Sequence, residues 1–210
     1  MTTPHRLLCS AIGFAAIVTT LVSPGHADSV SRDRRGLDRV DKGVWELGVG
    51  SLFSFASDTT GDTSVFRMST DANASVSYFF RDNLSIDAAG LLVYHSTGDD
   101  NSALLLGGTL GASAHLRLGH GAFVRPGLGL GVLAGNREIP IGATTVMEAP
   151  QLGVVARLRL PLAYFISRNL HVEGGPQLNL TAGSYTPEGA DSIGFTTVDG
   201  GFSVGAGYSF

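Results

Sequence analysis

The chain has 210 residues, of which 43% are hydrophobic and only 15% are charged, and it contains 29 glycines. The length suits one domain of ordinary size, and the charged fraction is well below that of an average soluble domain. The formal net charge of −4, without a basic patch, excludes a nucleic-acid-binding protein. Beyond the first 27 residues no apolar run is long enough for a transmembrane helix, so a helical membrane bundle is excluded.

Residues 1–27 have the features of a cleavable export signal. Arg6 gives a positive start, residues 7–22 are apolar, and a small-x-small motif ends at Ala27. We therefore expect cleavage between Ala27 and Asp28. A retained membrane anchor is the alternative, but the apolar stretch is shorter than a membrane span.

Cys9 is the only cysteine and lies within this segment. Acylation as a lipoprotein is disfavoured, because almost no apolar stretch precedes it. The mature chain would then contain neither a disulfide nor a cysteine-bound metal. The histidines are scattered without ligand spacing, so we expect no metal site and no cofactor.

Residues 28–42 are dense in both charges and have no period, which indicates a solvated periplasmic tail. From Gly43 to Phe210 the sequence alternates with period two, which indicates β-strands. We find eight such stretches, each close to the length of about 9–11 residues that a tilted strand needs to cross a bilayer. They cover residues 44–55, 68–80, 84–94, 103–118, 122–134, 151–164, 170–182 and 200–210.

One face of each stretch is apolar, and the other carries glycine, hydroxyl, amide or charged side chains. Solvated strand faces rarely hold so much glycine, because glycine weakens an exposed strand. The lumen of an eight-stranded barrel, in contrast, is just wide enough for side chains. We therefore predict an all-β fold: an eight-stranded antiparallel up-and-down transmembrane β-barrel, with the apolar face toward lipid and the polar face toward the lumen.

The connections alternate in length. Those at 81–83, 119–121 and 165–169 are tight, whereas 56–67, 95–102, 135–150 and 183–197 are longer and polar. Short periplasmic turns and longer outer loops are typical of transmembrane barrels. Two aromatic girdles are expected. The one at the short turns would contain Trp45, Tyr78, Phe79, Phe80, Tyr164, Phe165, Tyr208 and Phe210, and the outer one Phe53, Phe55, Phe66 and Tyr94.

An internal repeat relates two of the tight turns. The stretch YFFRDNLSID at 78–87 resembles YFISRNLHVE at 164–173, and the offset is half of an eight-stranded barrel. Duplication of a half-barrel would explain it. Convergent turn chemistry would explain it too, because asparagine suits tight turns.

The polar face carries four acids and four arginines. Such a balanced set is expected where charges are desolvated, because an unpaired buried charge is costly and arginine pairs with carboxylates through its fork. We predict a lumen closed on the periplasmic side by an ion-pair network around Arg157, Arg159 and Glu173, and open outside, where its lining would be polar. A loose row of charges in water, as in a pore, is the alternative. The set is Glu46, Asp71, Asp87, Arg117, Arg125, Arg157, Arg159 and Glu173.

The signal, the eight alternating strands, the tight inner turns and a last strand ending in Tyr-x-Phe resemble the small outer-membrane β-barrels of Gram-negative bacteria. The resemblance is strongest to the OmpA transmembrane domain and OmpX, and weaker to the OmpW group. The resemblance covers 43–210 and implies an outer-membrane location, contact with membrane lipid and lipopolysaccharide, periplasmic chaperones and the barrel assembly machinery. In that family the last strand is the assembly signal, which here implies Phe202, Val204, Tyr208 and Phe210. We expect no periplasmic domain after the barrel, and we expect a monomer.

The resemblance specifies function poorly, because one fold hosts many roles. We expect a structural and surface-interaction protein. A narrow channel for small or apolar molecules, as in the OmpW group, is the alternative, although this lumen is polar. A lipid A-modifying enzyme would need a nucleophile and a base in reach. His95 and Ser96, near Asp99 and Asp100, are adjacent, so they face opposite ways or lie in a loop, and we expect no catalytic residue.

Overall fold

The structure, a computed structural model, describes residues 40–60, 63–96, 102–119, 121–141 and 145–210. The chain divides into two units, Met1–Gly36 and Leu37–Phe210, and all described residues belong to the second. The expected signal, its cleavage site at Ala27 and Asp28, and the tail up to residue 39 lie outside the described residues.

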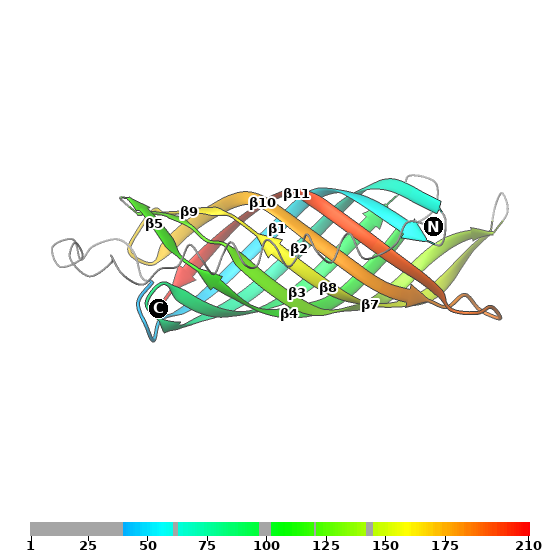
Figure 1. The fold of residues 1–210 in the computed structure, drawn as a ribbon, viewed down its shortest axis with the longest axis horizontal. Coiled ribbons are helices and arrows are strands. Elements are labelled where there is room, and N and C mark those ends of the chain that lie inside the picture. Colours follow the sequence, from blue (N-terminus) through cyan, green and yellow to red (C-terminus); the bar gives the residue numbers. More distant parts are fainter. Residues whose placement is uncertain (1–39, 61–62, 97–101, 120, 142–144) are drawn as a thin grey trace, which may run out of the picture. The chain divides into compact units, whose positions relative to one another are not determined.

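The described residues contain eleven β-strands, which are distinguished by colour in Figure 1. They are β1 (Trp45–Thr60), β2 (Thr63–Arg81), β3 (Leu84–Ser96), β4 (Ser102–Ala114), β5 (Leu116–Gly119), β6 (Ala122–Val124), β7 (Gly127–Ile141), β8 (Thr145–Arg159), β9 (Leu162–Phe165), β10 (Leu170–Tyr185) and β11 (Ile193–Ser209).

These strands form eight wall segments, because three segments are each interrupted once. β4 continues into β5, β6 into β7, and β8 into β9. Pro126 and Pro161 lie at two of the breaks and have no amide hydrogen for the ladder. Backbone hydrogen bonds bridge the breaks: the Arg125 amide donates to the Pro161 carbonyl at 2.9 Å, and the Ala114 amide to the Pro126 carbonyl at 3.0 Å.

The sheet closes on itself through β1 and β11. β1 pairs antiparallel with β2 on one side and with β11 on the other, where Glu46 faces Ser209 and Thr60 faces Phe195. β11 also pairs with β10, so neither strand is left with an open edge. The predicted eight-stranded antiparallel barrel is therefore confirmed, and Figure 1 shows its tilted strands.

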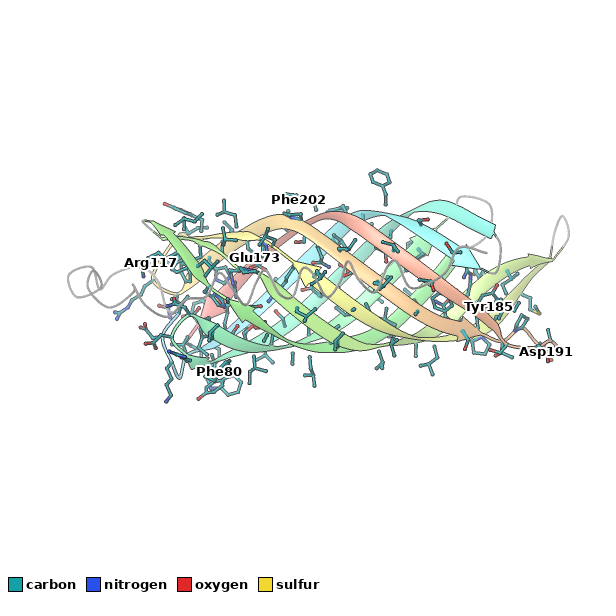
Figure 2. The ribbon with its side chains drawn as sticks, in the orientation of Figure 1. Phe80, Arg117, Glu173, Tyr185, Asp191 and Phe202 are labelled. Atoms are coloured by element: carbon teal, nitrogen blue, oxygen red, sulfur yellow. The ribbon has the colours of Figure 1, made fainter. Side chains whose placement is uncertain are left out.

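Side chains alternate between lumen and outer surface as predicted. The outer surface is apolar: large side chains such as Leu104, Leu106 and Leu110 are exposed there, and Figure 2 shows Phe202 on the outside. A continuous apolar surface of this kind is unfavourable in water and matches the hydrocarbon of a bilayer. The barrel is thus a transmembrane one.

The two ends of the barrel differ in their connections. We call the end with the turns near residues 82, 120 and 167 the short-turn end, and the other the long-hairpin end. Asn83 has a φ of 63°, and asparagine tolerates this left-handed conformation well. At the long-hairpin end, most of the expected loops are strand: 56–60, 63–67, 135–141 and 145–150 extend the ladder. Polar, β-branched residues such as Thr59 and Thr63 pair as well as apolar ones.

The girdle at the short-turn end is smaller than expected. Trp45, Phe80, Tyr164, Tyr208 and Phe210 are exposed on the outside, and Trp45 stacks on Tyr78 with ring centroids 4.8 Å apart. Phe79 and Phe165 point inward and are buried, which corrects their assignment. At the other girdle Phe53, Phe55 and Tyr94 are exposed, while the Phe66 side chain lies outside the described set.

Candidate functional site in the barrel lumen

The lumen near the short-turn end is centred on Arg125, whose side chain is only 3% exposed. Its Nη2 donates to Oε1 of Glu46 at 2.6 Å, and its Nη1 donates to Oε2 of Glu173 at 2.9 Å. Arg125 lies between β6 and β7, whereas the two acids lie on β1 and β10, which are not its neighbours in the sheet. The guanidinium therefore joins separate parts of the wall by charge-assisted hydrogen bonds, the stronger class.

His171 completes the surroundings of Arg125. Its Nε2 lies 2.7 Å from Arg125 Nη1 and must accept, because a guanidinium can only donate. Nδ1 then carries the hydrogen and faces Glu46 Oε2 at 3.6 Å. The alternation places His171 inward, but no role for it could be predicted, because its partners are distant along the chain.

Arg159 connects this group to a second carboxylate. Its Nη1 lies 3.9 Å from Glu173 Oε1, and its Nη2 lies 3.3 Å from Asp87 Oδ2. Nη2 also donates to the hydroxyl of Ser113 at 3.0 Å, and that hydroxyl donates to Asp87. Ser85 donates to the other Asp87 oxygen at 2.9 Å. We call Glu46, Asp87, Arg125, Arg159, His171 and Glu173 the lower ion-pair group.

A second group lies around Arg157. Its Nη2 donates to Oδ2 of Asp71 at 2.7 Å, and its Nε donates to Oδ1 of Asn179 at 3.2 Å. Asn179 also accepts from Gln177 Nε2 at 3.1 Å. All four side chains are buried, so each charge is both paired and hydrogen-bonded, as buried charges require.

Seven of the eight predicted lumen charges take part in these ion pairs. Arg117 does not belong to either group: it is exposed at the short-turn end, with Cζ 5.4 Å from the ring centroid of Phe123. The network was predicted around Arg157, Arg159 and Glu173, whereas the structure centres it on Arg125, and Arg157 pairs with Asp71. Which inward charges meet across the lumen depends on the tilt and stagger of the strands.

A small cavity of about 40 Å³ lies between the two groups. Its lining includes Asp87, Arg157, Arg159, Glu173 and Gln177. A polar space of this size has room for about one to three water molecules. It is far too small to be a continuous pore.

On one side of the lumen, the wall next to these groups carries an apolar cluster. Leu91, Val93, Leu105, Leu133 and Val155 are all buried and pack into one cluster, which we call the apolar belt. The belt contradicts our expectation of a polar lumen open to the outside. It arises because β3, β4, β7 and β8 each direct aliphatic side chains inward at this level.

Above the belt, the long-hairpin end is also packed. Ala149, Tyr185 and Phe195 form a buried cluster, and Arg137 places Cζ 5.0 Å from the Tyr185 ring centroid. Figure 2 shows Tyr185 and Asp191 at this end, opposite Arg117. This layer was not predicted, because residues 135–150 and 183–197 were expected to be loops.

Of the residues considered for catalysis, the structure describes the side chain of His95 only. His95 points into the lumen and is buried, with Nδ1 3.9 Å from Oδ1 of Asp199. The Ser96 side chain and residues Asp99 and Asp100 lie outside the described set.

An aromatic layer fills the mouth of the lumen at the short-turn end. Phe79, Phe123 and Phe165 are buried there together with Val40, and Val44 packs against them. Val40 was expected in a solvated tail, because its neighbours are charged, so its burial corrects that prediction. No pattern in one sequence shows that a lone valine leaves such a tail to enter a lumen.

Lumenal glycines make room for the charged side chains. A Cβ on Gly207 would lie 2.3 Å from Cε1 of His171, and one on Gly127 would lie 2.9 Å from Nε of Arg159. These positions account for part of the high glycine content, from which a crowded lumen was predicted.

The four residues implied as an assembly signal lie on the outer surface, three of them on β11. Phe202, Val204, Tyr208 and Phe210 are all exposed. Phe210 exchanges two backbone hydrogen bonds with Trp45, at 2.9 and 3.1 Å, so pairing continues past the end of β11.

No protein-family model matches the chain, and no curated protein matches it. None of the described residues lies in a helix long and apolar enough to cross a membrane. Among solved structures, the chain is similar to outer membrane protein OprG from Pseudomonas aeruginosa, at 15% identity and a TM-score of 0.49, over 81% of this chain and 97% of that chain. It is also similar to Neisserial surface protein A, at 12% identity and a TM-score of 0.48, over 80% and 100% of the two chains. The N-terminal β-barrel domain of Pseudomonas aeruginosa OprF gives 16% identity and a TM-score of 0.44, over 84% and 100%. By its own closed strand pairing and apolar outer surface, the chain is a small transmembrane β-barrel.

Proposed function

We propose that the protein is a sealed barrel of the Gram-negative outer membrane, with a structural and surface-interaction role. The observation that carries the proposal is the filled lumen. The aromatic layer, the two ion-pair groups and the apolar belt all place side chains inside it. A barrel without a continuous aqueous path can act only through its wall and its exposed ends.

The outer-membrane location rests on the sequence and on the fold together. An export signal at 1–27 would deliver the chain to the periplasm, and closed barrels with an apolar outer face suit that membrane. In this proposal periplasmic chaperones and the barrel assembly machinery insert the chain. The short-turn end faces the periplasm, and the long-hairpin end lies among lipopolysaccharide.

The two alternatives find less support. A channel for small or apolar molecules needs a path, and the buried belt around Leu105 occupies part of the lumen. A lipid A-modifying enzyme needs a nucleophile and a base exposed to the membrane. His95 instead faces the lumen and is buried.

Liposome uptake separates a sealed barrel from a channel. Protein reconstituted into liposomes, and shown to be folded by its heat-modifiable migration on gels, is expected to take up small sugars no faster than empty liposomes. Uptake that rises with the amount of folded protein would overturn the proposal. A change in the mass of lipid A on overexpression would support the enzyme instead.

A further inference from the structure

The short-turn mouth of the lumen is closed by a residue that belongs to no strand. Val40 is 5% exposed and packs against Phe79, Phe123 and Phe165, which come from β2, β6 and β9. We call these three rings the aromatic socket. Figure 1 shows the segment before β1, in blue, at the same end as β5 and β9.

A few hydrogen bonds hold the segment 40–43 in place. The Asn83 amide donates to the Val40 carbonyl at 2.9 Å, and the Gly43 amide donates to the Phe79 carbonyl at 2.7 Å. The Lys42 amide donates to Asp82 Oδ1 at 2.8 Å. All three bonds go to β2 or to the turn that follows it, so the segment is anchored on one side of the mouth only.

The apolar belt and the two ion-pair groups are attached to the barrel differently. The apolar belt and both ion-pair groups consist of side chains on wall segments that pair with neighbours on both sides, so they cannot leave without opening the barrel. Segment 40–43 can leave while every strand pairing stays intact. Local opening of this kind costs less than global unfolding, because few contacts are lost.

We propose that residues 40–43 are a removable stopper of the short-turn mouth. With Val40 in the aromatic socket, the lower ion-pair group is separated from water at that end. With Val40 withdrawn, water and small solutes reach the socket and the side chains just inside it. This goes beyond the proposed sealed barrel, because it makes one of the seals a movable part.

Cysteine labelling tests the stopper in the full-length chain, with Cys9 replaced by serine so that no other thiol is present. The reporter is Ala163→Cys, a fully buried position on β9 that pairs with Phe123 inside the socket. A charged, water-soluble maleimide is applied to the folded protein in lipid nanodiscs. A second reporter, Thr197→Cys, lies buried on β11, beyond the ion-pair groups.

The Ala163→Cys reporter is expected to label slowly with Val40 or with Val40→Ile. With Val40→Asp it is expected to label faster by about tenfold or more, because seating an aspartate in apolar surroundings is costly. Thr197→Cys is expected to stay slow throughout. Equal Ala163→Cys rates for Val40 and Val40→Asp would overturn the proposal. So would acceleration of both reporters, since Val40 would then support the whole barrel. Because the assay needs no conductance, it can fail independently of the liposome experiment.

Discussion

The lower and upper parts of the lumen are closed by different interactions. Near the short-turn end, Arg125 and Arg159 are held by carboxylates in a hydrogen-bonded network, whereas the apolar belt around Leu105 is held by packing alone. A buried ion pair fails abruptly when one partner is removed, because the other charge is left unpaired. An apolar cluster loses contacts in proportion to the atoms removed. Substitutions should therefore be poorly tolerated in the lower part and better tolerated in the upper part.

The largest effect is expected from Arg125→Ala. The change leaves the buried Glu46 and the partly buried Glu173 without their shared cation, and should lower the free energy of unfolding by about 3–5 kcal/mol. Urea unfolding in lipid vesicles, followed by the fluorescence of Trp45, the single tryptophan, measures it. Arg117→Ala removes an exposed arginine from the same end and should change stability by no more than about 0.5 kcal/mol. Similar losses for the two variants would contradict the account.

Leu105→Ala tests the upper part. The side chain is 1% exposed, and its truncation should cost about 2–4 kcal/mol through lost packing and a cavity. Leu106→Ala is the matched control, because the neighbouring side chain is 62% exposed on the outer surface. The same unfolding assay should show a clearly smaller loss for Leu106→Ala. If Leu106→Ala were the more harmful change, the assigned register would be wrong.

Gly207→Ala tests how tightly the lower part is packed. The added methyl group would meet the ring of His171, so we expect a loss of about 1–3 kcal/mol from overpacking. Gly200→Ala on the same strand is the control, since its Cβ would meet only Leu178 Cδ1 at 3.8 Å. Equal unfolding midpoints for the two variants would mean that His171 does not occupy this position.

Ser113→Ala should give the smallest effect. It removes one hydroxyl that accepts from Arg159 and donates to Asp87, while the ion pair itself remains. The expected loss is about 1 kcal/mol, as for an ordinary hydrogen bond. Ser57→Ala, at an exposed position of β1, should leave the unfolding curve unchanged. A loss as large as that of Arg125→Ala would show that the network depends on the hydroxyl rather than on the charges.

The sequence was sufficient for the fold, because alternation on eight segments leaves few other arrangements. Prediction from the sequence failed where apolar residues are consecutive, because the inward side chains could not be told from the outward ones. Leu104, Leu105 and Leu106 read as one apolar run, and the inward position of the middle residue disappears among outward neighbours. The same ambiguity affects Phe79 beside Phe80. The belt and the aromatic layer were missed for this reason.

The charged residues of the site were identified, but their pairing was not. Asp71 and Arg157 lie far apart in sequence, and their contact depends on the tilt and stagger of strands across the lumen. Predicting the contacts of His171 would have required the same information. No sequence pattern indicated that Val40 is buried, because it is a single apolar residue at the end of a charged stretch.

Planar-bilayer recording tests the central claim, that the lumen is sealed, most directly. Purified wild-type protein, inserted in folded form, is expected to give no steady ion-conducting openings, because in this account the belt, the ion-pair groups and the aromatic layer together fill the lumen. Steady openings of uniform size, in proportion to the folded protein inserted, would contradict the account.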